Sequence, residues 1–365
     1  MTSVCQQSMR VYQIKLFILS ILGLNSILIE PLHSQNKSSD EGGKLYELAA
    51  RAVAASDSRT VLGHNEKWLF LRNELIHVSK GNFWEKDWSK IAVSGKDPLD
   101  IFLSFKKKLD ALGVEFIFVP IPSKVNIYPE KFSDSVSMDG VLPLSNAQHQ
   151  IKSYFDKFRE AGINVIDIEP TLKARRPAES VTSYCLSDSH PSPMTCQLIA
   201  DSLAKKINSY KWAKKYAEDS DVSFIKRDPK MIEVVGDLVP EDKRETWSPE
   251  KLMISKVYSK INGELKPLIP DNESSPVIVM GDSHTLIFHE GEDMHASGAG
   301  LVDHLQEKVG FKVFLAASRG SSSQALRQIY KGKEFWEGKK MLIWVSSVRE
   351  FTEERRWLQL PRLPR

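Results

Sequence analysis

Three side chains with complementary chemistry lie on two segments that are far apart in the sequence. Ser283 ends a Gly-Asp-Ser tripeptide that follows an apolar run, and Asp188 and His190 are two positions apart in a loop. A serine hydroxyl becomes a nucleophile when a base takes its proton, and a histidine base needs a carboxylate that fixes its tautomer and stabilises its charged form. These residue types predict acyl transfer, with Ser283 as nucleophile, His190 as base and Asp188 as the orienting carboxylate.

Each fragment also has an ordinary interpretation. A Gly-Asp-Ser tripeptide is most often a strand-to-helix turn with a capping serine, and Asp-x-His is more often a helix-entry aspartate followed by a surface histidine. In an extended stretch, residues two apart project to the same side, so Asp188 and His190 would face one site. The two fragments together are therefore a stronger signal than either alone.

Four further residues are candidates for the oxyanion or the substrate. The tetrahedral oxyanion of acyl transfer needs backbone donors, which we expect near Ser283 and in the loop of Gly320. Lys124 and Arg349 each lie just past the carboxyl end of an expected strand, where they would meet an anionic or hydroxyl-rich substrate, and Tyr128 lies close by. Solvated surface cations are the alternative for Lys124 and Arg349.

A cluster of histidine and acidic residues follows the serine turn and offers metal-ligand chemistry. It consists of His284, His289, Glu290, Glu292, Asp293 and His295. Their spacing matches no zinc template, and a charged loop beside the site explains them more simply. We therefore expect no metal and no other cofactor.

The elements that would position these residues alternate between helical and strand patterns, which predicts an α/β fold with a mostly parallel sheet covered by helices. Apolar runs predict strands at Val114–Pro120, Ile163–Ile168, Pro276–Met280, Lys312–Ala316 and Met341–Val345. Amphipathic patterns predict helices at Asp100–Leu112, about Asn146–Glu160, Pro193–Ile207, Gly300–Val309 and Ser322–Tyr330. The serine turn then lies at the carboxyl ends of the strands, where open α/β sheets gather their sites.

The chain also divides by composition. Residues 1–34 carry Arg10 and Lys15 before an apolar run from Leu16 to Ile29, which predicts a signal peptide or an N-terminal anchor. Residues 35–60 look like an exposed, weakly structured lead-in, and 61–365 form one domain in which the polar segment 208–274 is an insertion or lid. Because the segment 1–34 is typical of export, we expect the bulk of the chain to lie in the periplasm or elsewhere outside the cytoplasm, either soluble or held by an N-terminal anchor. Past the leader, no apolar run reaches membrane-spanning length.

Charge and cysteine content narrow the function further. The 365 residues contain 50 Lys and Arg and 47 Asp and Glu, a net charge of +3 that is too balanced for a protein that mainly neutralises nucleic-acid phosphates. Cys5 would leave with the leader. Cys185 and Cys196 then become a pair in a compartment that permits disulfides, and the sequence leaves a bridge and two buried thiols equally open.

Over most of its length, the chain resembles the SGNH-hydrolase-like domain of alginate O-acetyltransferases of the AlgJ and AlgX type. The resemblance lies in the order and spacing of short motifs: Gly63-His64-Asn65 with Trp68–Leu71, Val119–Lys124, Tyr128-Pro129-Glu130, Asp188-x-His190, Gly236-Asp237-Leu238, Val279–Ser283, Gly300–Leu305, Gly320 with Ala325 and Arg327, and Trp344 with Arg349. It implies a flavodoxin-like three-layer sandwich and the triad Ser283, His190 and Asp188. It also implies a polysaccharide acceptor and an acetyl donor delivered by a membrane-bound O-acyltransferase.

Three positions depart from the family pattern. His284 replaces the usual Phe after the nucleophile, Pro191 replaces the usual Trp after the catalytic histidine, and Val345 replaces an acidic residue. The first expectation is an exported polysaccharide O-acetyltransferase. An esterase with the same triad and a non-catalytic polysaccharide-binding scaffold are the alternatives, since water and a sugar hydroxyl compete for one acyl-enzyme and a fold does not fix a function.

Overall fold

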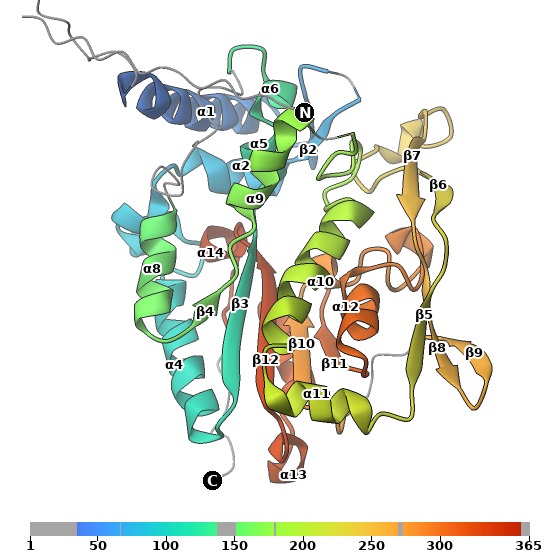
Figure 1. Cartoon of the computed structure of the whole chain (residues 1–365). Coiled ribbons are helices and arrows are strands. Elements are labelled where there is room, and N and C mark those ends of the chain that lie inside the picture. The colour runs from blue at the N-terminus through green and yellow to red at the C-terminus, as the bar shows by residue number, and fades with distance from the viewer. Residues whose placement is uncertain (1–34, 66, 137–150, 179, 269–272, 359–365) are drawn as a thin grey trace, which may run out of the picture.

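The structure is a computed structural model that describes residues 35–65, 67–136, 151–178, 180–268 and 273–358. Its centre is a five-stranded sheet in the order β11-β10-β12-β3-β4, in which all neighbouring strands are parallel. These strands are β3 (Glu115–Ile121), β4 (Asn164–Val165), β10 (Val277–Gly281), β11 (Phe314–Ala317) and β12 (Met341–Ser347). They run side by side through the middle of the molecule (Figure 1), which confirms the predicted α/β class with a parallel sheet.

Alternate residues of each central strand enter two different hydrophobic cores. In β3, Ile117 and Val119 pack in one core, whereas Phe116 and Phe118 pack in the other. Because successive side chains of a strand point to opposite faces, a strand that is covered on both sides has to be apolar at nearly every position. This requirement explains the continuous apolar run from which the strand is predicted.

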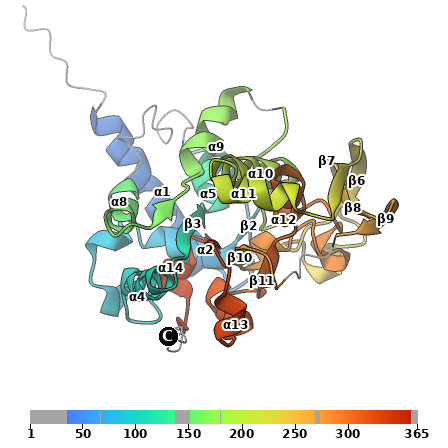
Figure 2. The same ribbon diagram turned by 60° about the horizontal axis from the view of Figure 1, so that its bottom comes forward.

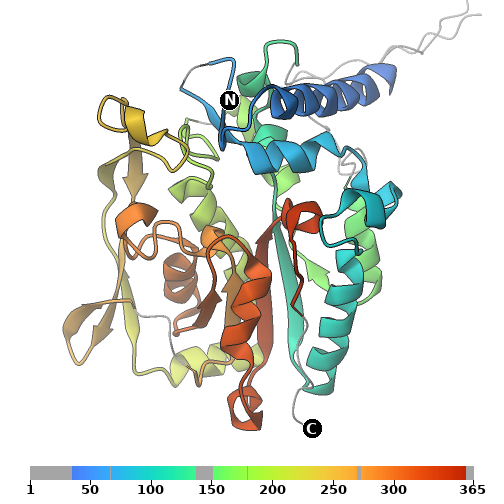
Figure 3. The ribbon, with the colours of Figure 1, turned by 180° about the vertical axis from the view of Figure 1, so that it is seen from behind.

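Helices cover both faces of the sheet. α10 (Pro193–Ile207) and α12 (Leu301–Val309) supply one core, while α4 (Pro98–Ala111), α8 (Lys152–Glu160) and the 3₁₀ helix η7 (Ser322–Ile329) supply the other. Figure 2 shows α10 on one side of the sheet and α4 on the other, and Figure 3 shows α4, in cyan, from behind. Trp344 of β12 stacks on Phe102 of α4 with ring centroids 4.6 Å apart, so aromatic packing joins the sheet to the helical layer that contains α4.

Shorter helices connect these elements. The α-helices are α2 (Arg72–Ser79), α3 (Trp88–Ile91), α5 (Lys124–Ile127), α6 (Pro129–Phe132), α9 (Glu169–Arg175), α11 (Lys211–Glu218), α13 (Lys333–Trp336) and α14 (Glu350–Glu353). The 3₁₀ turns are η1 (Phe83–Glu85), η3 (Arg176–Ala178), η4 (Glu241–Lys243), η5 (Ser283–Thr285) and η6 (Glu292–Met294). A short hairpin, β1 (Thr60–Leu62) with β2 (Leu69–Leu71), precedes α2.

Most predicted elements agree with the structure to within a few residues, and the bounds of α10 are those predicted. The helix predicted over Ser322–Tyr330 is instead the 3₁₀ helix η7. The strand predicted over Ile163–Ile168 pairs with β3 only at two residues, so β4 is shorter than expected. Of the helix predicted from about Asn146, residues 146–150 lie outside the described residues.

The prediction of a weakly structured lead-in over residues 35–60 is wrong for most of that segment. Residues Gln35–Ala55 form helix α1, and Leu45 and Ala49 are buried in the core that also contains Leu75 of α2. Leu45, Leu48, Ala49 and Ala52 recur at helical spacing, which gives this otherwise polar helix a narrow apolar stripe. The polar composition of the segment obscured that stripe.

The insertion predicted over 208–274 folds into α11 and two small antiparallel sheets. One sheet pairs β5 (Ser223–Lys226), β8 (Val257–Ile261) and β9 (Glu264–Pro267), and the other pairs β6 (Lys230–Val234) with β7 (Glu250–Ile254). Figure 1 shows these strands along the right-hand edge of the molecule, beside α10 and α12. The predicted signal peptide or anchor over 1–34 lies outside the described residues, and within them we find no helix that is long and apolar enough to span a membrane.

Candidate active site

Ser283 lies in the turn that leaves the carboxyl end of β10, as the sequence predicts. The turn is tight because a Cβ on Gly281 would lie 2.4 Å from Cγ2 of Thr285 and 2.8 Å from the carbonyl oxygen of Val345. Only glycine fits such an approach. Asp282 holds the turn in place: Oδ1 accepts from the amide of His284 at 2.9 Å and Oδ2 accepts from the amide of Ser347 at 3.1 Å.

The structure brings Ser283, His190 and Asp188 together in the order that a proton relay requires. Nε2 of His190 lies 2.8 Å from Oγ of Ser283, and Nδ1 lies 2.6 Å from Oδ1 of Asp188. A carboxylate only accepts hydrogen bonds, so Nδ1 carries the proton and Nε2 is free to accept one from the serine. The three side chains can therefore perform nucleophilic acyl transfer.

The electrostatics of the pair favour the charged form of the histidine. Burial opposes the charged form of His190, but the charge and hydrogen bond of Asp188 outweigh it and raise the pKa of His190 above its usual value. Burial likewise opposes ionisation of Asp188, yet the charge of His190 and the hydrogen bonds from His190 and His295 hold the pKa of Asp188 well below its usual range. Asp188 is thus a permanent carboxylate that stabilises a protonated His190.

Asp188 and His190 face one site for a reason other than the extended geometry assumed from the sequence. The segment is a series of bends, and the amide of His190 donates to Oδ1 of Asp188 at 2.9 Å. This local hydrogen bond turns the chain so that the imidazole folds back over the carboxylate. The structure brings the two side chains together, but the backbone that presents them is bent rather than extended.

The insertion is part of the site rather than a detached lid. The amide of Asp237 donates to Oδ2 of Asp188 at 2.9 Å, and the Asp237 carboxylate accepts from the amide of Ser189 at 2.7 Å. A Cβ on Gly236 would lie 2.1 Å from the carbonyl oxygen of Ser187, so the two loops can approach this closely only with glycine there. The Gly-Asp-Leu element therefore serves to lock the loop that carries Asp188 and His190.

Sequence reasoning missed the contact that His295 makes. Nε2 of His295 lies 2.7 Å from Oδ2 of Asp188, so two imidazoles flank one carboxylate. His295 has a positive φ of 69°, which is uncommon outside glycine. The sequence placed His295 only in the candidate metal cluster, and no local spacing signals a partner that is more than a hundred residues away.

A cavity of about 440 Å³ surrounds the nucleophile. Ser283, His190, Gly320 and Arg349 all line it, so two of the four predicted substrate or oxyanion candidates lie beside the triad. Gly320 has φ +85°, a conformation that favours glycine. Arg349 lies 3.9 Å from the buried carboxyl group of Glu74.

Lys124 and Tyr128 do not face this cavity, contrary to the prediction. Lys124 is fully buried, and its Nζ donates to the carbonyl oxygens of Leu69 and Leu186, both at 2.7 Å, and to that of Asp188 at 3.0 Å. Burial lowers the pKa of Lys124 to about 8. The hydroxyl of Tyr128 accepts from the amide of Ser183 at 2.6 Å. Lys124 thus supports the loop that carries Asp188 and His190, and Tyr128 supports the segment that leads into it.

Cys185 and Cys196 are free thiols, so of the two outcomes that the sequence leaves open the structure has the unbridged one. Cys185 lies beside the short bridge between Tyr184 and Pro191, and its thiol donates to the carbonyl oxygen of Pro191 at 3.8 Å. Cys196 lies in the first turns of α10. Burial raises the pKa of both thiols, which keeps them protonated.

The predicted histidine and acidic cluster does not converge on one point. His284 pairs with Asp282, His289 with Asp303, and Glu290 and Asp293 with Arg319. Ligand atoms of Asp188, His190 and Asp237 do lie within 4.8 Å of one another. Asp188 and His190 contact each other, and the Asp237 carboxylate pairs with Ser189 and Arg59, so these hydrogen bonds and ion pairs explain the proximity of the three residues.

Comparisons with known proteins agree with this architecture. A family model described as an SGNH hydrolase-like domain of the acetyltransferase AlgX matches residues 60–346. The O-acetyltransferase domain of Pseudomonas putida AlgJ has a similar structure, with 16% identity, a TM-score of 0.54, and 80% of this chain and 92% of that chain covered. Pseudomonas aeruginosa AlgX gives 14% identity, a TM-score of 0.54 and coverage of 81% and 64%. No curated protein sequence matches the chain.

Proposed function

The chain belongs to the SGNH hydrolase-like AlgX acetyltransferase family, and from this premise we propose that it is an exported O-acetyltransferase that transfers an acetyl group through Ser283 to a polysaccharide hydroxyl. One observation carries the proposal. Oγ of Ser283, both ring nitrogens of His190 and Oδ1 of Asp188 form a continuous chain of contacts of 2.8 and 2.6 Å. A family relationship alone would not require this alignment.

The first half-reaction transfers the acetyl group from the donor to Ser283. Nε2 of His190 takes the proton of Ser283 while Oγ forms a bond to the acetyl carbonyl carbon of the donor. The resulting oxyanion collapses and breaks the bond between that carbon and the donor oxygen or sulfur, which leaves with the proton from His190. The products are an acetyl ester on Ser283 and a neutral imidazole.

The second half-reaction transfers the acetyl group from Ser283 to the acceptor. A sugar hydroxyl gives its proton to Nε2 of His190 and attacks the acetyl carbon, and the collapse of the second oxyanion releases Oγ of Ser283, which recovers its proton from His190. Backbone amides at Ser283 and in the Gly320 loop are the proposed donors to both oxyanions, and each such donor typically contributes about 3 kcal/mol to the transition state. Arg349 would contact the acceptor or the donor from the cavity wall.

The partners follow from the same premise. The acceptor is a polysaccharide, and the acetyl donor is supplied by a membrane-bound O-acyltransferase that carries acetyl groups across the membrane. The protein would act in the periplasm, either released from its N-terminal segment or anchored by it.

Incubation of the purified protein with a small acetyl ester, with and without oligosaccharide acceptors, tests the proposal. The transferase gives acetylated acceptor at the expense of free acetate, and Ser283→Ala abolishes both products. Acetate release that no acceptor reduces would identify an esterase instead. Full polymer acetylation in cells that carry Ser283→Ala would identify a scaffold and end the proposed mechanism.

A further inference from the structure

A buried carboxyl group beside the Gly320 loop, residues 318–321 between β11 and η7, has no role in the function proposed above. Glu350 begins helix α14 and is 2% exposed. Gly320 and Arg349 line both the cavity that contains Ser283 and a smaller cavity of about 210 Å³, and of these two cavities Glu350 lines only the smaller. A carboxyl group is rarely buried unless it is paired or hydrogen-bonded, so its partners indicate what it does.

Glu350 fixes the residue that follows the Gly320 loop. Oε1 of Glu350 accepts from the amide of Ser322 at 2.8 Å, and Oε2 accepts from the Ser322 hydroxyl at 2.7 Å. Nε1 of Trp344, in β12, donates to the same hydroxyl at 2.8 Å. Ser322 is fully buried and begins η7. One carboxyl group and one indole therefore anchor the C-terminal end of the loop.

Glu350 also contacts the turn that presents the nucleophile. Its side chain hydrogen-bonds with that of Asp282, the residue before Ser283. Oδ1 of Asp282 accepts from the amide of His284 at 2.9 Å and from Nδ1 of His284 at 2.8 Å, and Oδ2 accepts from the amide of Ser347 at 3.1 Å. Three N–H donors favour the ionised form of a carboxyl group. Asp282 is therefore the carboxylate of this pair.

The proton of the pair lies on Glu350. Burial raises the pKa of Glu350 well above its usual value, and the negative charge of Asp282 raises it further. Two carboxyl groups in contact inside a protein do not both ionise, because their charges would repel each other. Glu350 is therefore a neutral acid that donates to Asp282 and accepts from Ser322. It joins the nucleophile turn to the Gly320 loop without adding a charge.

The other contacts of the Gly320 loop lie closer to the surface. Its first part continues from β11, and the next side chain, Arg319, forms two ion pairs of 2.6 Å. The Arg319 side chain is 47% exposed, and water and salt weaken such pairs. Among the described contacts that follow the strand, the bonds between Ser322 and Glu350 are the first that are buried. They therefore set the position of Gly320.

We propose that Glu350 is a positioning residue for acyl transfer, which bridges Asp282 and Ser322. Through this bridge it holds the backbone amides of the Gly320 loop at the distance from Ser283 that the oxyanion requires. This inference rests on the proposed function, because only that function places an oxyanion there. Loss of the bridge leaves the triad complete and moves the donors. It lowers kcat more than it changes KM, since oxyanion donors act mainly in the transition state.

Hydrolysis of a small acetyl ester by three variants of the intact protein tests this role. Glu350→Gln keeps a neutral side chain of the same length, with a donor for Asp282 and an acceptor for the amide of Ser322, so kcat should stay within about threefold of normal. Glu350→Ala removes the bridge, and Glu350→Asp keeps a carboxyl group on a shorter side chain. We expect both to lower kcat by about tenfold or more with little change in KM, since a whole oxyanion donor contributes about a hundredfold to a thousandfold.

Two further measurements test whether Glu350 acts through Ser322. The double variant Glu350→Ala with Ser322→Ala should be about as slow as Glu350→Ala alone, because both changes break the same bridge. The indole N–H of Trp344 donates to the Ser322 hydroxyl, so its NMR resonance should shift in Glu350→Ala and stay nearly in place in Glu350→Gln. This resonance needs no activity. Should Glu350→Ala fail to fold, Glu350→Asp serves for both measurements.

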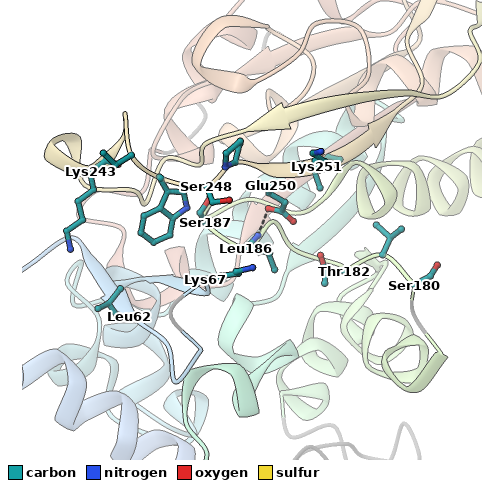
Figure 4. Close-up of a pocket in the computed structure, with 15 residues that line it drawn as sticks. Leu62, Lys67, Ser180, Thr182, Leu186, Ser187, Lys243, Ser248, Glu250 and Lys251 are labelled. Carbon is teal, nitrogen blue, oxygen red and sulfur yellow. Dashed lines mark hydrogen bonds between the residues drawn. The ribbon is translucent and has the colours of Figure 1, made fainter.

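The control variants make the same truncations elsewhere. Glu337→Ala changes an exposed glutamate that lies just before β12. Ser248→Ala changes an exposed serine that lines a separate cavity of about 730 Å³ at the insertion, which Figure 4 shows. Neither is among the described residues that line the cavity of Ser283. Both variants should leave kcat, KM and the Trp344 resonance unchanged.

Several results would overturn the role of Glu350. They are a normal kcat in Glu350→Ala and Glu350→Asp, a raised KM without a loss of kcat, and a loss in Glu350→Gln as large as that in Glu350→Ala. Additive effects of Glu350→Ala and Ser322→Ala, or a Trp344 resonance that Glu350→Ala leaves in place, would also overturn it. Failure of the proposed function appears differently, as ester hydrolysis that survives Ser283→Ala, and the Trp344 resonance then still decides whether the bridge exists.

Discussion

Nε2 of His295 lies 2.7 Å from Oδ2 of Asp188, the carboxylate oxygen opposite to the one that contacts His190. Asp188 is therefore held between two imidazoles, one of which faces Ser283 while the other comes from a different loop. The second histidine is a positioning residue in this arrangement, because it acts on the base only through the carboxylate.

His295 also lines the cavity that contains Ser283, so His295→Ala should lower kcat by a larger factor than it changes the KM for the acceptor. A hydrogen bond to a charged group contributes about 1.5 to 3 kcal/mol, so we expect kcat to fall on the order of tenfold to a hundredfold. His295→Gln, which keeps a donor, should recover part of the loss. His64→Ala changes an exposed histidine away from the cavity and is the control. A normal kcat in His295→Ala would exclude this role.

The acid limb of the pH profile should lie above the ordinary histidine value of 6.5. His190 must be neutral to accept a proton, and its raised pKa means that activity is lost as pH falls through that higher value. Asp188→Asn removes the charge that raises the pKa, so the limb should move to lower pH while the rate drops. The dependence of kcat/KM on pH measures both effects, and an acid limb at or below 6.5 in the unmodified protein would contradict the prediction.

Gly236→Ala and Gly43→Ala should change stability in opposite directions. A Cβ at position 236 meets the carbonyl oxygen of Ser187 at 2.1 Å, whereas position 43 in α1 has nothing within 4 Å. We expect the first change to cost about 1 to 3 kcal/mol of unfolding free energy, with reduced kcat, and the second to gain roughly 0.5 to 1 kcal/mol. Urea unfolding measures both. Equal stability of the two variants would show that the close packing of Gly236 against the loop of Asp188 and His190 does not stabilise the fold.

Lys124→Met should destabilise the fold rather than weaken substrate binding. The ammonium group matches its three N–H bonds to three backbone carbonyl oxygens, and each buried acceptor left without a donor costs about 1 to 3 kcal/mol. Because the carbonyl oxygen of Leu186 also accepts from the amide of Leu69 at 3.0 Å, the change removes the donor from the other two oxygens, and we expect a loss of at least about 2 kcal/mol. Lys107→Met, an exposed lysine of α4, should change stability by less than about 0.5 kcal/mol. A stable Lys124→Met protein with a raised KM would instead return Lys124 to the substrate site.

Much of the fold could be predicted because its signals are local. The apolar run of β3 and the amphipathic pattern of α10 depend only on neighbouring residues, and both appear in the structure with nearly the predicted bounds. Helix α1 was missed because a few apolar residues are enough to bury one stripe of a mostly polar helix. The residues of α2 that pack against this stripe lie outside the segment, so the sequence of the segment alone does not indicate them.

Local sequence patterns were enough to predict the α/β architecture, the turn that presents Ser283 and the residue types of a nucleophile, a base and a carboxylate. The residues that surround them are known only from the folded chain, which brings Asp237 and His295 to Asp188, buries Lys124 under the same loop and leaves Arg349 and Gly320 beside the nucleophile. These contacts join residues that are far apart in the sequence. Short-range preferences set each helix and turn, whereas contacts between remote loops depend on how packed cores and close glycine approaches orient whole segments, and no local pattern records that orientation.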